Sequence, residues 1–226
     1  MSGRLTWNLE KVEWRLMTKR TILIVARLFF AILTLFAIGY QFVYLAHLGV
    51  LNVVNFFSYF TNLSNIFASV VFIAGAIFLI QQREPTPTQD LVRGASVVAM
   101  VIVFIVYGVL LRDIDLGNLQ PWVNIVIHYI FPLVVLADWL YQPLRSTLRF
   151  AQMGYWLIYP LIYLVYTLIR GAIVGFYPYP FLNPATAGGY GGVALYCVAI
   201  FAAFLIVGAV LIALENWSRG AIGRAA

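Results

Sequence analysis

The sequence predicts an all-α polytopic membrane protein: a bundle of six transmembrane helices with both termini in the cytoplasm. Hydrophobic residues make up 63% of its 226 residues and charged residues only 10%. A soluble domain carries roughly 25% charged residues, so this chain has too few charges to cover a surface in water. Six long apolar stretches and an uneven placement of Lys and Arg are the other observations that predict this fold class.

Each apolar stretch has roughly the 20 residues that a helix needs to cross the hydrocarbon core of a bilayer. The strands of a membrane barrel would instead alternate over about 10 residues, whereas these segments are continuously apolar. We therefore expect one transmembrane domain over residues 20–216, between an N-terminal segment (1–19) and a C-terminal tail (217–226). Its helices are predicted at residues 21–46, 56–81, 92–111, 122–141, 153–171 and 190–215.

Lys and Arg gather at one end of the predicted helices. Only Arg112 and Arg170 fall at the other end, and Arg27 lies within the first helix, from which it can snorkel inward. Because cytoplasmic loops carry an excess of Lys and Arg, the basic end is predicted to be cytoplasmic. The eleven residues at that end are Arg4, Lys11, Arg15, Lys19, Arg20, Arg83, Arg93, Arg145, Arg149, Arg219 and Arg224.

The N-terminal segment lacks the short apolar core and small-residue cleavage site of a signal peptide. Residues 4–19 combine basic residues with tryptophan, which favours a short interfacial helix on the inner leaflet, with a flexible tail as the alternative. The compact chain shows no eukaryotic targeting signal, so we expect a bacterial plasma (inner) membrane.

Composition excludes several classes of function. The net charge of +6 comes from residues that flank apolar spans and form no stripe or arm, so no nucleic acid partner is expected. Both lysines, Lys11 and Lys19, precede the first span, so none could hold retinal. No metal-ligand spacing surrounds the single cysteine, Cys197, and neither a metal nor another cofactor is predicted. A single deep carboxylate, Asp138, gives little support to a transporter or channel.

Polar side chains gather where the second and fourth helices begin, at the predicted outer face. Asn124 and His128 are four residues apart on one face of the fourth helix. Thr61 and His128 each lie about six residues, or roughly 8–10 Å, below the outer ends of their helices, which predicts matching depths. The second helix carries the densest polar stripe of the chain, at Ser58, Thr61, Asn62 and Asn65.

These residues suggest nucleophilic chemistry. A threonine hydroxyl is a weak nucleophile unless an adjacent base takes its proton, and histidine is the usual base, so Thr61 and His128 form a candidate catalytic pair. A structural role also fits, because Thr, Asn and Ser in membrane helices commonly bond their own helix or join two helices. The candidates for holding an oxyanion or positioning a substrate are Asn62, Asn65, Asn124 and Ser58.

No carboxylate is clearly placed to complete a triad. Asp138 lies about 15 Å along the helix from His128, too far for a hydrogen bond. It is expected to pair at the inner interface with Arg145 or Arg149. Asp113 and Asp115, at the outer end of the third helix, could orient the imidazole. Pairing of these two aspartates with Arg112 and Arg170 at the rim is favoured instead.

Aromatic residues dominate the fifth helix and the loop that follows it. Aromatic belts are common at membrane interfaces and are the default interpretation. The functional interpretation is a lid over a cavity that is open to lipid at the outer leaflet. The residues expected to form this cavity or lid are Tyr163, Arg170, Tyr177 and Tyr179.

The layout of nearly the whole chain resembles the androgen-induced-protein-like family of integral membrane proteins, which has bacterial relatives. Three motifs carry the resemblance: Phe60-Thr-Asn-Leu-Ser-Asn65, Asn124-Ile-Val-Ile-His128 and Tyr159-Pro-Leu-Ile-Tyr163. Vertebrate members are threonine hydrolases that cleave fatty acid esters of hydroxy fatty acids with an essential Thr and His. The resemblance implies Thr61 as nucleophile and His128 as base. A distant branch linked to acyl transfer uses a cysteine, which this chain lacks at both positions.

Two hypotheses follow from the sequence. The first is an intramembrane lipid-ester hydrolase without a cofactor, whose partners are membrane lipids and a lipid-ester substrate and whose active site is extracytoplasmic. The second is a non-catalytic lipid-binding or regulatory membrane protein, in which the same polar cluster packs helices or holds a head group. The sequence does not indicate the oligomeric state.

Overall fold

The computed structural model describes residues 2–142, 144 and 148–225, with side chains described between Met17 and Trp217. Within these residues it contains helices and loops but no strand. Six described helices are long and apolar enough to cross a membrane, so the predicted membrane bundle is confirmed. They are Met17–His47, Phe60–Ile80, Pro87–Leu111, Pro121–Tyr141, Phe150–Val174 and Gly189–Trp217.

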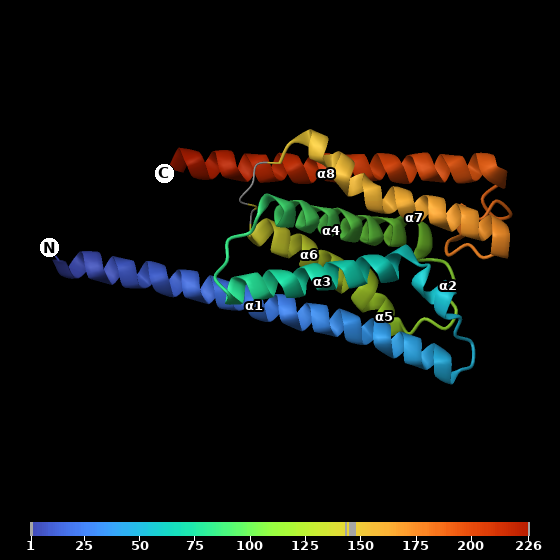
Figure 1. Ribbon diagram of the computed structural model, residues 1–226, viewed down its shortest axis with the longest axis horizontal. Helices are drawn as coiled ribbons and strands as arrows, with labels where there is room; N and C mark the ends of the chain where they lie inside the picture. The colour runs from blue at the N-terminus through green and yellow to red at the C-terminus, as the bar shows by residue number, and fades with distance from the viewer. Residues whose placement is uncertain (1, 143, 145–147, 226) are drawn as a thin grey trace.

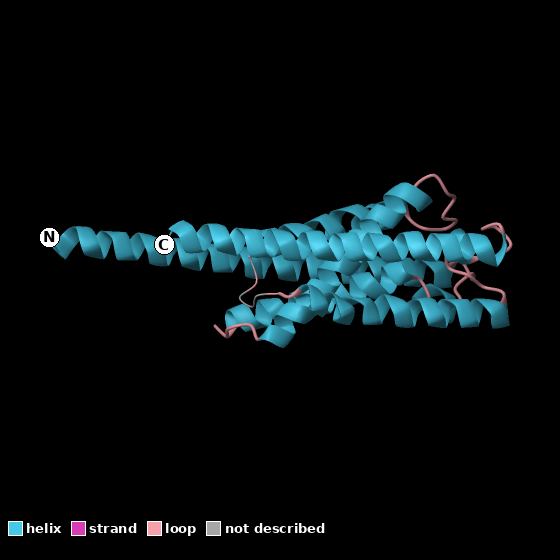
Figure 2. Ribbon diagram, turned by 90° about the horizontal axis from the view of Figure 1, so that it is seen from above, coloured by secondary structure: helices cyan, strands magenta, loops and turns pink. Residues whose placement is uncertain are grey.

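The helices lie along one axis, and α1 and α8 run along opposite sides of the bundle (Figures 1 and 2). In chain order the α-helices are α1 (Ser2–His47), α2 (Val53–Phe57), α3 (Phe60–Ile80), α4 (Pro87–Val106), α5 (Pro121–Ile125), α6 (Phe131–Tyr141), α7 (Met153–Val174) and α8 (Gly189–Ala225). Two π-helical turns interrupt this series, Tyr107–Leu111 after α4 and Val126–Ile130 between α5 and α6. Short 3-10 turns precede α7 and α8, at Phe150–Gln152 and Pro180–Leu182.

Both termini lie at the same end of the bundle, which we call the terminal end (Figure 1). The opposite end, which we call the loop end, carries the segments 48–59, 112–120 and 175–188. This arrangement follows from the even number of spans and places the polar starts of α3 and α5 at one end.

Side-chain polarity is arranged for a lipid environment. Large apolar side chains point outward, including Val109, Ile162, Ile173, Leu195 and Val198. Several polar side chains are fully buried instead, including Thr34, Ser64, Asn65, Ser69 and Ser96. In water this distribution would be unfavourable, whereas in a bilayer the apolar exterior meets lipid. Two of the buried polar side chains join helices, since Ser64 bonds the hydroxyl of Tyr159 and Asn65 bonds the carbonyl of Ile127.

The second span begins later than predicted. Residues 56–81 do not form one helix, because α2 ends at Phe57 and Tyr59 has an extended backbone before α3 starts. Side chains take the carbonyls that a continuous helix would have used: Asn62 donates to the carbonyl of Phe56 at 2.8 Å, and Tyr163 to that of Ser58 at 2.9 Å. These two backbone carbonyls at the break therefore have side-chain hydrogen-bond partners.

The N-terminal segment also differs from the prediction. α1 runs without interruption from Ser2 to His47, so residues 4–19 extend the first helix rather than forming a separate interfacial one. Neither Gly nor Pro occurs between residues 4 and 38, so nothing in the sequence ends the helix there. The side chains of residues 1–16 lie outside the described part.

A buried charge cluster joins α1, α4 and α6 near the terminal end. Asp138 accepts hydrogen bonds from Arg27 Nε at 2.7 Å and Arg27 Nη2 at 2.9 Å, and from Arg93 Nη2 at 3.0 Å. Arg27 is only 4% exposed, so it does not snorkel to the surface as predicted. A charge in apolar surroundings is tolerated when it is paired, and the two arginines supply that pairing.

This cluster corrects the partners predicted for Asp138. Arg149 does not bond it, and Arg145 lies outside the described residues. The sequence could not show that α1 crosses α6 at this depth. At the rim, by contrast, Arg112 and Asp113 form the exposed ion pair that was favoured, at 3.1 Å.

One glycine allows α4 to approach α7 closely. A methyl group on Gly94 would overlap the indole of Trp156, which is 3% exposed and donates to the carbonyl of Leu91 at 2.9 Å. We expect Gly94→Ala to lower the free energy of unfolding by about 1–3 kcal/mol, the cost of an overpacked contact. Thermal unfolding in detergent measures this effect.

The matched control is Gly39→Ala in α1, where an added methyl group meets nothing within 4 Å. That change should leave stability unchanged or raise it slightly, because alanine favours a helix interior. Equal unfolding temperatures for the two variants would contradict the close contact at Gly94.

Candidate active site

A cavity of about 510 Å³ lies at the loop end of the bundle. Residues from α1, α3, both π-helical turns and the loops 112–120 and 175–188 line it. The polar groups in its wall include Thr61, Asn62, Tyr107, His128 and Tyr179. The predicted pair, Thr61 and His128, therefore faces one shared space although the two residues come from different helices.

His128 lies in the π-helical turn Val126–Ile130. Proline has no N–H, so Pro132 cannot donate to the carbonyl four residues before it, which belongs to His128. The backbone takes the wider register instead, and the N–H of Phe131 donates to the carbonyl of Val126. Such turns occur frequently at functional sites, and this one directs the imidazole into the cavity wall.

Two neighbours fix the orientation of the imidazole. Its ring stacks on that of Tyr107, with centroids 4.0 Å apart and planes inclined by 18°. Its Nδ1 lies 2.6 Å from Oδ1 of Asn124, whose Nδ2 donates to the Tyr107 hydroxyl at 2.6 Å. Each of the three side chains therefore contacts the other two: Tyr107, Asn124 and His128.

This group also selects the tautomer of His128. With Nδ2 of Asn124 directed at Tyr107, its Oδ1 faces the imidazole, and a carbonyl oxygen can only accept. In the neutral imidazole the proton therefore resides on Nδ1, which leaves the electron pair on Nε2. No described residue bonds Nε2. A neutral histidine whose second nitrogen faces a cavity is the form that a general base requires.

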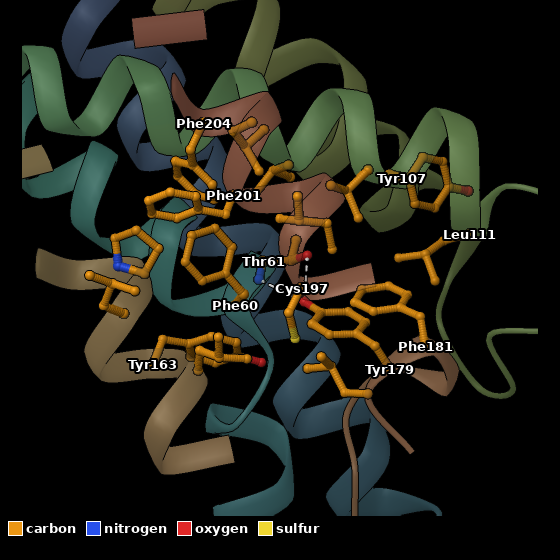
Figure 3. Close-up of a pocket in the computed structure, with 18 of the residues that line it drawn as sticks. Phe60, Thr61, Tyr107, Leu111, Tyr163, Tyr179, Phe181, Cys197, Phe201 and Phe204 are labelled. Carbon is orange, nitrogen blue, oxygen red and sulfur yellow. Dashed lines mark hydrogen bonds between the residues drawn. The ribbon is translucent and has the colours of Figure 1, made fainter. Parts of the chain in front are cut away.

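Thr61 is the second residue of α3 and is 7% exposed. Both of its hydrogen-bonding groups meet Tyr179: the backbone N–H donates to the phenol oxygen at 3.2 Å, and Oγ1 lies 3.3 Å from it (Figure 3). Burial raises the pKa of the Tyr179 phenol to about 12, so the phenol keeps its proton at neutral pH. It can therefore donate to Oγ1 and leave the proton of Thr61 available.

The start predicted for the helix that carries Thr61 is wrong, because this helix begins at Phe60 and not near residue 56. Thr61 lies in the first turn of α3, whereas His128 is the eighth residue of its span. The difference has a chemical consequence, since the first-turn N–H groups of a helix lack partners within that helix and its positive dipole end favours negative charge. Tyr59 provides no side-chain cap for α3. These N–H groups are candidates for holding an oxyanion beside Thr61.

The asparagines and the serine predicted to position a substrate are engaged elsewhere. Only Asn62 lines the cavity, and its Nδ2 is bonded to the carbonyl of Phe56. Ser58 bonds the carbonyl of Val54 and the hydroxyl of Tyr166. Asn65 bonds two backbone carbonyls, and Asn124 bonds His128 and Tyr107.

Asn65 links the two halves of the site. Its Nδ2 donates to the carbonyl of Thr61 at 2.8 Å and to that of Ile127 at 3.1 Å. One amide therefore ties the turn that carries the hydroxyl to the residue that precedes His128. Asn65 is therefore placed to hold the backbones beside the two candidate residues in a fixed relation.

The residues predicted to form a cavity or lid fall in different places. Tyr177 and Tyr179 line the 510 Å³ cavity from the loop 175–188, and Tyr163 lines a second space. Arg170 lines neither, because its Nη2 donates to Oδ1 of Asn55 at 2.6 Å. It also packs on the ring of Phe176, 5.2 Å from the centroid.

A second, narrower cavity of about 100 Å³ adjoins the first and lies between α3, α4, α7 and α8 (Figure 3). Thr61, Tyr107, Leu111 and Tyr179 line both cavities. The remaining lining is almost entirely apolar and includes Ile102, Leu164, Cys197, Phe201 and Phe204. Thr61 and Tyr179 therefore stand at the junction of a polar space and an apolar one.

Sequence reasoning missed Tyr107, which touches both His128 and Asn124. The available signal was weak: Tyr107 is the only tyrosine in the third span. No fixed spacing relates it to the polar residues of the other helices. Among the described residues, no group of three or more His, Cys, Asp or Glu side chains could hold a metal ion.

Comparison of the chain with protein-family models, with curated proteins and with solved structures finds no match.

Proposed function

We propose that this chain is an intramembrane hydrolase of fatty acyl esters, with Thr61 as nucleophile and His128 as general base. The observation that carries the proposal is the shared cavity, in which a hydroxyl at a helix N-terminus and an imidazole oriented by Asn124 and Tyr107 face the same space. The androgen-induced-protein-like motifs support the same pair, and fatty acid esters of hydroxy fatty acids are the substrate that this resemblance suggests.

The reaction needs no group beyond those of the chain and water. Oγ1 of Thr61 attacks the ester carbonyl carbon as its proton passes to Nε2 of His128. The tetrahedral intermediate then collapses, the bond from the carbonyl carbon to the alcohol oxygen breaks, and the leaving alcohol takes that proton. The N–H groups of the first turn of α3 would hold the oxyanion, with that of Thr61 exchanging its bond to the Tyr179 hydroxyl for one to the substrate. Water, deprotonated by His128, then attacks the acyl-threonine, and the fatty acid leaves as Oγ1 takes the proton back from His128. Catalytic hydrogen bonds often tighten only when substrate is bound, so Thr61 and His128 need not bond each other beforehand.

The two cavities suit the two parts of such a substrate. The narrow cavity offers apolar side chains to an acyl chain, and the larger one offers polar groups to the other part of the ester. The ester bond would then lie at their junction beside Thr61. With the basic terminal end on the cytoplasmic side of a bacterial plasma membrane, this site faces the outer leaflet.

One observation favours a second candidate function, a non-catalytic lipid-binding protein. The hydroxyl of Thr61 is bonded to Tyr179 and not to His128. In that function the junction holds a lipid carbonyl by hydrogen bonds and no covalent step occurs. The two candidates differ in whether Thr61 becomes acylated.

Covalent labelling separates them. Detergent-purified protein is treated with a fluorophosphonate probe, and the adduct is located by mass spectrometry. We expect labelling of Thr61 that is lost in Thr61→Ala and reduced in His128→Ala, because the probe reacts only with an activated hydroxyl. Ser58→Ala removes a neighbouring buried hydroxyl that lines neither cavity and should label normally.

A folded, monodisperse wild type that remains unlabelled would reject the nucleophile and favour the lipid-binding function. Labelling at another hydroxyl would move the active site away from Thr61.

A further inference from the structure

A third cavity, of about 640 Å³, lies at the terminal end between α1, α3 and α4. It shares no lining residue with the two cavities at the loop end. The proposed hydrolase does not use it, so any role for it is independent of ester cleavage.

Its polar lining is strongly cationic. The basic side chains in its wall are Lys19, Arg20, Arg27, Arg83 and Arg93. Asp90 is the only carboxylate among the described lining residues, and Asp138 lies behind the wall, bonded to Arg27 and Arg93. Five cations thus face two carboxylates, and an anionic ligand would restore the balance.

One of these cations has an unused donor. Arg27 bonds Asp138 and Gln142 through Nε and Nη2, but no described residue accepts from its Nη1. This nitrogen lies against Gly75, where an added methyl group would come within 2.8 Å of it. The glycine lets the guanidinium rest against α3, in the wall of the cavity. A nearly buried guanidinium nitrogen without a partner is suited to a phosphate oxygen.

The rest of the wall is apolar. α3 contributes Phe67, Val70, Val71, Ala74 and Phe78, and both Val70 and the nearby Ile77 are exposed on the outer surface of the bundle. The cavity therefore combines cations near the end of the spans with an apolar wall along their length. A lipid has the same division between head group and acyl chain.

We propose that this cavity binds the phosphate head group of an anionic membrane lipid, with an acyl chain of that lipid along α3. The lipid belongs to the leaflet at the terminal end, which is the cytoplasmic leaflet in the orientation given above. A basic pocket between transmembrane helices is a recognised setting for such head groups. A free phosphate would satisfy the cations but would leave the apolar wall without a partner.

Native mass spectrometry of the full chain tests this proposal. Purified protein is equilibrated with phosphatidylglycerol or with phosphatidylcholine of the same chains, and retained lipid is counted. We expect phosphatidylglycerol to be retained preferentially. Arg83→Gln should lower its apparent affinity about fivefold, because each cation near a membrane surface attracts anionic lipid by that order. The double variant Lys19→Gln/Arg83→Gln should lower it by more than tenfold.

Both substituted side chains are exposed, so the bundle should keep its unfolding temperature in the absence of lipid. The matched control is Arg112→Gln, which removes one exposed cation at the loop end and should change retention less than twofold. Inorganic phosphate is added alone in a parallel thermal unfolding series.

Three outcomes would overturn the proposal. Equal retention of the two lipids would show that the site does not select an anionic head group. Equal losses of affinity in Arg83→Gln and Arg112→Gln would show that the lipid does not bind in the terminal-end cavity. Stabilisation by inorganic phosphate as large as that by phosphatidylglycerol would identify a free anion as the ligand. None of these results depends on whether Thr61 reacts.

Discussion

Thr61→Ala should reduce hydrolysis of a fatty acyl ester by about 10⁴-fold, to the level that binding and oxyanion stabilisation alone provide. His128→Ala should fall to a similar level, because a nucleophile and its base act as one unit and their losses do not add. Turnover of a chromogenic medium-chain ester by protein in detergent micelles measures both variants.

Asn124 makes this prediction sharper. Asn124→Ala removes the nearer acceptor of the Nδ1 proton, leaves the backbone carbonyl of residue 124 at 3.3 Å, and keeps the nucleophile and base in place, so the imidazole is held less firmly in one tautomer. We expect a loss of about 10²-fold in kcat with little change in KM. A purely structural asparagine would instead lower the amount of folded protein and leave the kcat of the remainder unchanged.

The matched control is Ser58→Ala, since Ser58 is a buried hydroxyl three residues before Thr61 that bonds Val54 and Tyr166. It should keep turnover within about threefold of wild type, as expected for a group that acts only through packing. Thr61→Ala with activity equal to that of Ser58→Ala would reject Thr61 as the nucleophile.

The overall fold was predictable because it follows from local properties of the chain. Continuous apolar runs of sufficient length require helices in a bilayer, where every backbone group must be bonded within its own segment. The break before α3 was not predictable, because it depends on Asn62 and Tyr163 taking backbone carbonyls near it. Tyr163 comes from a helix about a hundred residues away.

The same distinction applies to the candidate site. Thr61 and His128 could be singled out because polar groups are costly in a membrane and these two carry useful chemistry. Their supporting residues could not, since the contacts of Tyr107 with His128 and of Tyr179 with Thr61 join separate segments. Asn65 was predicted in the right region but with a different role, as a link between the backbones on both sides of the site.

Asp138→Asn should be the most destabilising single change in the charge cluster. It removes the carboxylate from between Arg27 and Arg93, whose guanidinium groups are both largely buried. Breaking a buried pair leaves an uncompensated charge, which costs about 3–5 kcal/mol. Thermal unfolding of the variant in detergent should show a correspondingly lower midpoint.

The control is Asp113→Asn, which breaks the ion pair with Arg112 at the exposed rim. Such a pair contributes little, about 0–1 kcal/mol, so the midpoint should barely move. Similar shifts in the two variants would mean that water reaches Asp138 freely and that the cluster is not a buried one.

A double variant distinguishes loss of attraction from burial of an unpaired charge. If the cost in Asp138→Asn arises because Arg27 remains charged without its carboxylate, then adding Arg27→Gln should recover part of the lost stability. If the cost arises only from lost hydrogen bonds, the second substitution should lower stability further. Arg27 is also the cation with the free Nη1 in the terminal-end cavity. Recovery of stability with loss of bound phosphatidylglycerol would show that one guanidinium group holds the helices together through Asp138 and binds the lipid through its other nitrogen.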